Sequence, residues 1–207
     1  NYMRYFILAL LISVLGCSPK EPNFCKIPEK KEPAVRKKII FDEDFSVRVT
    51  KPIMRGFKQW QTATEGLVEV TVSDTPLKDA VEAKGCTDNL WVTVLGLKEA
   101  RMLTQQQLPE ETLAITRSSC TLSVIAFIDE NITSEDEVEL ASAVNFGKIL
   151  GIKPKSDGNV RLVTDDLVNS AKCVTKFDLI EFCAKYKCEA QFLSPCKNPE
   201  RKPWDKQ

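Results

Sequence analysis

The sequence predicts an α+β fold, in which helices pack on a β-sheet and the C-terminal part is rich in cysteine. Segments in which apolar residues alternate, as in strands, are interspersed with segments of helical spacing. One helical segment, residues 134–151, carries apolar residues on all sides and is therefore expected to be buried. Four of the eight cysteines lie in the last quarter of the chain. A chain of 207 residues is long enough for one domain with a sizeable core.

The first residues predict an export signal rather than a folded element. Residues 3–17 read MRYFILALLISVLGC, in which the single cation Arg4 precedes an apolar or small run that ends at Gly16. This run is short for a membrane span and suits the core of a signal peptide. It ends in VLGC, which resembles a bacterial lipobox with Cys17 as the acylated residue. We predict a lipoprotein signal peptide over 1–16, with a plain secretory signal as the alternative.

An acylated Cys17 predicts a location in the cell envelope, on a membrane surface, because two or more acyl chains hold a protein there durably. Ser18, by resemblance to Gram-negative lipoproteins, permits sorting to the outer membrane; the periplasmic face is the other location that we expect. Residues 17–38 are charged and repeatedly broken by proline, which predicts a tether that does not order itself. The folded domain is expected over 39–196, and a disordered tail over 197–207.

Seven cysteines follow Cys17, and export makes disulfides their expected state. Cys86 and Cys120 flank a predicted strand around Trp91 and could join each other. The odd number leaves one thiol free or intermolecular, and Cys25 could pin the tether to the domain. The connectivity of the others stays open, although we expect them to hold the C-terminal helix to its neighbours: Cys173, Cys183, Cys188 and Cys196.

The first half of the domain predicts two strands and one helix. Residues 41–49 alternate at Phe45, Val47 and Val49, which indicates a strand. A helix is then expected to begin at the N-cap Thr50, with Pro52 in its first turn, and to end at Gly66. Its apolar face carries Ile53, Phe57 and Trp60, and a second strand follows over 67–72.

The second half predicts two further strands and two helices. Residues 89–97 and 121–129 read as strands, and the latter is apolar on both faces, which indicates an interior position in the sheet. Ser134 and Glu137 form a capping box that begins the buried helix, and Gly151 ends it. Thr175 and Asp178 form another capping box, at the start of the last helix.

Three segments in this order resemble the matrixin branch of the metzincins, a class of zinc peptidases. IMRGFKQWQTATEGLVEVTV (53–72) is similar to the first helix and following strand of the family. ASAVNFGKILGI (141–152) is similar to its active-site helix, H-E-x-x-H-x-x-G-x-x-H, and 165–186 to its methionine turn and final helix. The resemblance spans about Ile39 to Cys188. It implies a twisted mixed sheet packed by the first helix and a buried former active-site helix, with a small disulfide-rich C-terminal subdomain.

The positions that bind zinc in the family carry other residues here. The three histidine positions hold Val144, Lys148 and Pro154, the general-base glutamate position holds Asn145, and the methionine position holds Val168. Valine and proline offer zinc no donor atom, an ammonium repels it, and an asparagine is no base near neutral pH. The resemblance therefore implies a pseudopeptidase with no zinc, no cofactor and no catalytic residue.

The composition excludes several further classes of function. Lys plus Arg and Asp plus Glu number 29 each, so no net charge attracts nucleic acid. The absence of histidine removes histidine-based catalysis and histidine metal sites. Acidic runs at 42–44 and 129–130 could coordinate calcium, but lack the spacing of a calcium loop, so solvated turns are the preferred interpretation.

We predict a protein that binds a peptide or protein partner through the vestigial cleft, beside a sheet edge where a peptide can add as a strand. Two alternatives stay open. One is an active metallopeptidase or other hydrolase that uses an unrecognised site. The other is a purely structural, disulfide-stapled lipoprotein in which the cleft is filled by Val144, Phe146 and their neighbours.

Overall fold

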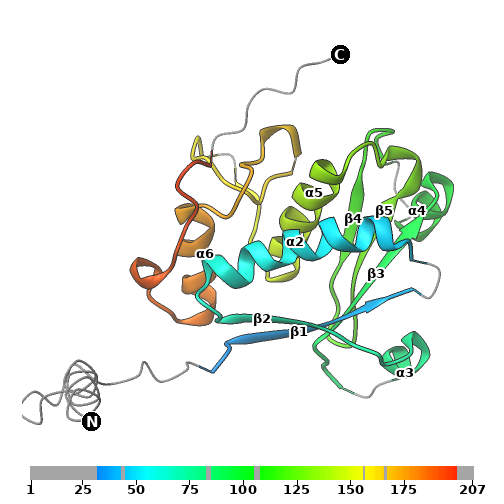
Figure 1. Ribbon diagram of the computed structural model, residues 1–207, viewed down its shortest axis with the longest axis horizontal. Coiled ribbons are helices and arrows are strands. Elements are labelled where there is room, and N and C mark those ends of the chain that lie inside the picture. Colours follow the sequence, from blue (N-terminus) through cyan, green and yellow to red (C-terminus); the bar gives the residue numbers. More distant parts are fainter. Residues whose placement is uncertain are drawn as a thin grey trace, which may run out of the picture. The chain divides into compact units, whose positions relative to one another are not determined.

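Five strands in one sheet, with helices packed on it, make up the computed structural model (Figure 1). It describes residues 32–42, 45–82, 85–104, 108–155, 157–165 and 167–199. The described residues from Pro33 onward form one compact unit. The α+β prediction is thereby confirmed. In chain order the elements are β1 (Val35–Phe41), α2 (Val47–Ala63), β2 (Val68–Val72), α3 (Leu77–Glu82), β3 (Asn89–Leu95), α4 (Leu97–Thr104), β4 (Ala114–Arg117), β5 (Ser123–Ile128), the 3₁₀ turn η1 (Asp129–Asn131), α5 (Glu135–Ile149), η2 (Leu167–Asn169), α6 (Lys176–Tyr186) and η3 (Ala190–Phe192).

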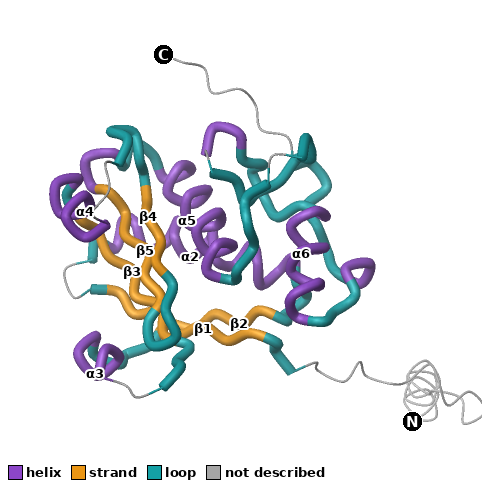
Figure 2. Tube along the Cα trace, turned by 180° about the vertical axis from the view of Figure 1, so that it is seen from behind, coloured by secondary structure: helices purple, strands orange, loops and turns teal. Residues whose placement is uncertain are grey.

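The strand order is β2-β1-β3-β5-β4, and the sheet is mixed. β1 runs parallel to β2 and β3, β3 runs parallel to β5, and β4 pairs with β5 in the antiparallel direction. β5, predicted as an interior strand, has a neighbour on each side. β4 lies at one edge, with α5 beside it in Figure 2. Within the described residues, no helix is long and apolar enough to cross a bilayer.

The start of the domain differs from the prediction in two respects. β1 begins at Val35, so it includes residues 35–38 of the segment that we interpreted as a tether. Residues 47–49, predicted as the end of a strand, form the first turn of α2. The N-cap is Ser46, whose hydroxyl accepts a 3.3 Å hydrogen bond from the Arg48 amide, whereas the Thr50 hydroxyl donates to the Ser46 carbonyl at 3.2 Å. Pro52 consequently lies inside the helix rather than in its first turn.

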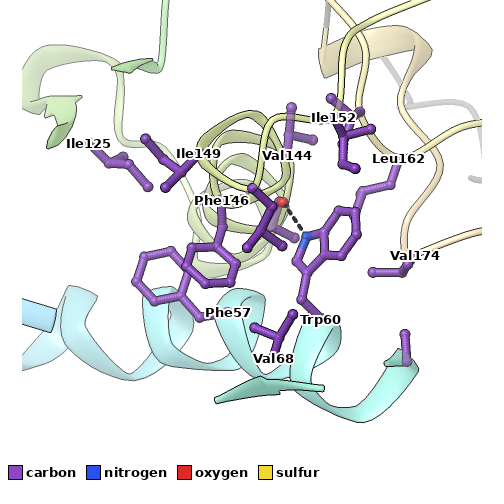
Figure 3. Close-up of a cluster of buried hydrophobic side chains, with 14 of the residues drawn as sticks. Phe57, Trp60, Val68, Ile125, Val144, Phe146, Ile149, Ile152, Leu162 and Val174 are labelled. Carbon is purple, nitrogen blue, oxygen red and sulfur yellow. Dashed lines mark hydrogen bonds between the residues drawn. The ribbon is translucent and has the colours of Figure 1, made fainter. Parts of the chain in front are cut away.

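Helices α2 and α5 cross tightly, and their contact is the centre of the core (Figure 3). Phe57 of α2 and Phe146 of α5 stack with ring centroids 4.7 Å apart. A glycine stands on each helix at the crossing. A Cβ on Gly56 would lie 2.4 Å from the carbonyl oxygen of Glu139, and one on Gly147 would lie 2.6 Å from Cζ2 of Trp60.

The capping box predicted at Thr175 is confirmed in full, whereas the one predicted at Ser134 is confirmed only for the Ser134 hydroxyl, because the Glu137 carboxylate accepts from the Thr133 hydroxyl instead. Ser134 caps α5 by accepting a hydrogen bond from the Glu137 amide, and Thr175 forms a full capping box with Asp178. α5 is buried on most sides, as its sequence predicts, because the strands, α2 and the C-terminal segment surround it. The helix ends at Ile149 with Leu150 as C-cap, and Gly151 follows with a φ of +82°, in the left-handed region that glycine adopts without strain.

Among the described residues, three disulfides link parts of the domain: Cys86–Cys120, Cys173–Cys196 and Cys183–Cys188. The first is the pairing considered from the sequence, and the other two confirm that the late cysteines fasten the segment around α6. Helix α6 also contacts the end of α5, because the Lys185 ammonium and the Tyr186 hydroxyl each donate to the Leu150 carbonyl at 2.9 Å.

Several predictions concern parts of the chain that lie outside the described residues. These parts are the signal peptide, Cys17, Cys25, and most of the tether and of the tail.

Candidate functional site: the outer face of α5 and the edge of β4

The predicted vestigial positions lie mainly on the face of α5 that is turned away from α2. Glu139, Ala143 and Gly147 face α2, and at 100° per residue Val144 and Lys148 point to the other side. Figure 3 shows Val144 on that side. Its exposure is 1%, so the position is filled by packing. Val144 and Lys148 share this face because residues four apart in an α-helix lie on the same side.

Lys148 places a cation on this face of the helix, near its C-terminal end. It is half-buried, and burial lowers the pKa of its ammonium, while the nearby carboxylate of Asp165 acts in the opposite direction. Asn145 is buried, and its amide donates to the Ala141 carbonyl one turn earlier at 2.8 Å. The Asn145 side chain is therefore engaged with the backbone of its own helix.

The two remaining vestigial positions lie beyond the helix. Val168 belongs to η2, which packs against α5, so the loop with Asp165 and Val168 approaches the face that carries Lys148. Pro154 is half-buried in the segment after Gly151. The structure thus brings 144, 148 and the η2 loop into one neighbourhood, and it shows no contact that would place Pro154 at the same point.

No metal site follows from the acidic groups. Among the residues that the structure describes, no three Asp, Glu, Cys or His side chains are grouped so that they could hold a metal ion. Asp42, from the first acidic run, instead accepts hydrogen bonds from the Trp91 indole at 2.6 Å and from the Thr93 hydroxyl. Glu43 and Asp44 lie outside the described residues.

The edge strand β4 offers backbone groups that no described residue uses. The Ile128 amide donates to the Leu113 carbonyl at 2.9 Å, so 113 and 128 form a hydrogen-bonded pair of the antiparallel ladder. Such pairs alternate along an antiparallel ladder. Ala114 and Thr116, opposite Phe127 and Ile125, are consequently the residues whose N–H and C=O groups turn away from β5.

A pocket on the described surface lies elsewhere, at the other end of α5. It has a volume of about 490 Å³ and opens where β1, β3 and β5 end and where α2 and α5 begin. Asp42, Val94 and Asp129 reach it from the strands, and Ser46 and Ser134 from the helix starts. The vestigial positions Val144, Asn145 and Lys148 do not line it.

Sequence reasoning missed both the β4 edge and this pocket. β4 has only four residues, Ala114–Arg117, without a strong apolar alternation, and it was not predicted as a strand. The pocket is assembled from the ends of several elements, and only the strand order brings those ends together. The signal available in the sequence was the polar residues Asp42 and Asp129, each directly after a strand.

The chain matches no protein-family model, and no curated protein matches it. The resemblance to the metzincins therefore stays a prediction from residues and element order.

Proposed function

We propose that the chain is a non-catalytic, lipid-anchored envelope protein with a metzincin-like framework, and that it binds an extended segment of a peptide or protein partner along β4. The observation that carries the proposal is the free edge of this strand. At Ala114 and Thr116 the outward N–H and C=O groups can pair with an added strand, which is how many domains bind peptides.

The framework is supported by the order and packing of the elements. β1, α2 with its late Trp60, β2, the remaining strands, α5, η2 and α6 follow each other as the resemblance implies. Gly147 and Gly151 have physical reasons for their positions, a close helix crossing and a left-handed turn. At the ligand positions, Val144 is packed into the core and Lys148 is cationic, so neither would hold zinc.

The proposed binding uses the strand edge rather than a cleft. Val144 and Asn145 are buried, so neither side chain is accessible to a bound peptide. Backbone pairing at β4 needs neither group, because its affinity comes from main-chain hydrogen bonds. Edge strands are commonly protected against such pairing by charge; in β4 only Arg117, at its end, is charged.

Export and anchoring are supported to different degrees. Three disulfides are what an oxidising, exported compartment favours. Attachment through an acylated Cys17 is supported by the lipobox-like VLGC of residues 14–17. Mass spectrometry of the protein extracted from membranes, in comparison with Cys17→Ser, tests the anchor: the acyl mass should be present in the first and absent in the second.

The binding proposal is tested by selecting extended peptides from a random library against the purified full chain. Thr116→Pro removes an outward N–H without removing a bond to β5, and proline is tolerated on an edge strand at such a position. Thr116→Ala keeps the N–H and is the matched control. We expect Thr116→Pro to weaken the selected peptides about tenfold and Thr116→Ala to leave them unchanged, since a lost hydrogen bond leaves a buried group unpaired.

Hydrogen exchange provides the second readout. The amides of Ala114 and Thr116 should exchange more slowly when a selected peptide is bound. If the library yields no peptide above background, or if selected peptides bind the proline variant as well as the native chain, binding at β4 is wrong. The structural role of a disulfide-stapled lipoprotein would then be the better interpretation.

A further inference from the structure

The pocket of about 490 Å³ lies where open sheets with parallel strands commonly bind ligands. The chain goes from β1 through α2 to β2 on one side of β1, and β3 lies on the other side and leads on to β5. The order therefore reverses between β1 and β3, which defines a switch point. Asp42 follows β1 and Val94 belongs to β3, and both line the pocket at that point.

The walls of the pocket are about half apolar and half polar, and its volume is in the range of small-molecule sites, roughly 300–1,000 Å³. Phe45 is held in place by Phe41, with ring centroids 5.0 Å apart. An apolar group of a ligand would cover Phe45, Val49 and Ile132, which are only half-buried. The apolar lining is formed by Phe45, Val49, Pro52, Val94, Ile132 and Val138.

Four charged side chains line the same pocket, and two of them are already engaged. Asp42 accepts from Trp91 and Thr93, and Glu135 pairs with Arg55 at 3.2 Å. Arg48 and Asp129 are different, because neither side chain has a hydrogen bond or ion pair with any described residue. The pocket thus presents one cation and one anion that are available to a ligand.

We propose that this pocket binds a small zwitterion of the α-amino acid class, a free amino acid or a dipeptide with an apolar side chain. Asp129 would accept hydrogen bonds from the ligand ammonium, and Arg48 would donate to its carboxylate. The carboxylate gains further from the start of α2, which begins at Val47 and has its positive dipole end there. The apolar side chain packs between Phe45 and Ile132. This inference is independent of the binding that we propose at β4.

The experiment is calorimetric titration of the full chain with free apolar amino acids, such as leucine and phenylalanine, and with the dipeptides Leu-Leu and Phe-Phe. Comparison of the affinities for the amino acids and for the dipeptides shows which of these two ligand classes the pocket binds. N-acetyl-leucine lacks the ammonium and leucinamide lacks the carboxylate. We expect each blocked form to bind about tenfold or more weakly than its parent, since each loses a charge-assisted hydrogen bond.

Two variants and two controls assign the charges. Asp129→Asn should weaken binding of the parent ligand about tenfold and leave binding of the N-acetyl form unchanged. Arg48→Gln should likewise weaken binding of the parent ligand about tenfold and leave binding of the amide unchanged. Asp136→Asn and Lys51→Gln make the same charge changes on exposed residues outside the pocket and should change nothing. The proposal is wrong if no ligand binds at millimolar concentration, if blocked forms bind as well as their parents, or if the controls weaken binding as much as the pocket variants.

Discussion

The indole Nε1 of Trp60 donates a hydrogen bond to the backbone carbonyl oxygen of Ala143 at 2.8 Å, in the middle of the core. This bond fastens α2 to α5, because Trp60 is fully buried and its polar atom needs a partner. Gly147 makes the contact possible. It lies one turn after Ala143, and its missing side chain leaves space for the indole ring.

Gly147→Ala is expected to destabilise the protein by about 1–3 kcal/mol, because the new methyl group overpacks the core. Its Cβ would lie 2.3 Å from Cγ2 of Val163 and 2.6 Å from Cζ2 of Trp60. In a helix, alanine is otherwise favoured over glycine by up to about 1 kcal/mol, so a loss must come from the overlap. Urea denaturation measures it.

Gly96→Ala is the control for this change, since the nearest atom to its Cβ is the end of the Glu130 side chain at 3.4 Å. We expect its free energy of unfolding to stay within about 0.5 kcal/mol of the native value. Equal stability of Gly147→Ala and the native chain would mean that α2 and α5 do not cross as closely as described.

Asp178→Asn is expected to cost about 2–5 kcal/mol, because a buried amide donor would replace an acceptor of several hydrogen bonds. The Asp178 carboxylate is fully buried and accepts from the amides of Leu162 and Val163 at 2.9 and 3.1 Å and from Thr175. Asp74→Asn, at an exposed loop position, makes the same chemical change and should be nearly neutral. Thermal unfolding of both variants, followed by circular dichroism, would refute a structural role if the two midpoints coincided.

Lys148→Met is expected to stabilise the domain slightly at neutral pH, because burial lowers the pKa of Lys148 and the charged form is disfavoured in the fold. The unfolded chain then holds this proton to a higher pH than the native chain. The penalty is fully present below the native pKa and is relieved as the pH rises from it towards the ordinary lysine value of about 10.4.

Denaturation curves between pH 7 and pH 10 check this sign. The gain from Lys148→Met should be largest at pH 7 and shrink towards pH 10, whereas Lys153→Met, at an exposed position, should show no such trend. A loss of stability at pH 7 would show instead that the ammonium forms a favourable pair with Asp165.

The helices α5 and α6 were predictable because their boundaries depend on local chemistry. Ser134 and Thr175 cap them through hydrogen bonds to residues three positions later, and Gly151 takes a left-handed turn. The start of α2 was not predictable in the same way. Phe45 and Val49 fit both a strand alternation and a helical spacing of four, so a short apolar run does not discriminate between them.

The candidate site was predictable only in part, because it depends on contacts between distant segments. The sequence identifies α5 and the shared face of Val144 and Lys148. It does not reveal that packing fills position 144, or that the short strand β4 forms the sheet edge. The pocket with Arg48 and Asp129 requires residues 81 positions apart (129 minus 48) to meet, which follows only from the strand order.

The three disulfides should stabilise the domain in the order of the loops that they close. Cys86–Cys120, Cys173–Cys196 and Cys183–Cys188 have sequence separations of 34, 23 and 5. Restriction of the unfolded chain predicts about 3.8, 3.4 and 2.2 kcal/mol, respectively. Guanidinium denaturation of the three double Cys→Ala variants measures the order. If loss of Cys183–Cys188 lowers the free energy of unfolding the most, this disulfide acts mainly on the native state. There it holds the last turn of α6, in which Lys185 and Tyr186 donate hydrogen bonds to the end of α5.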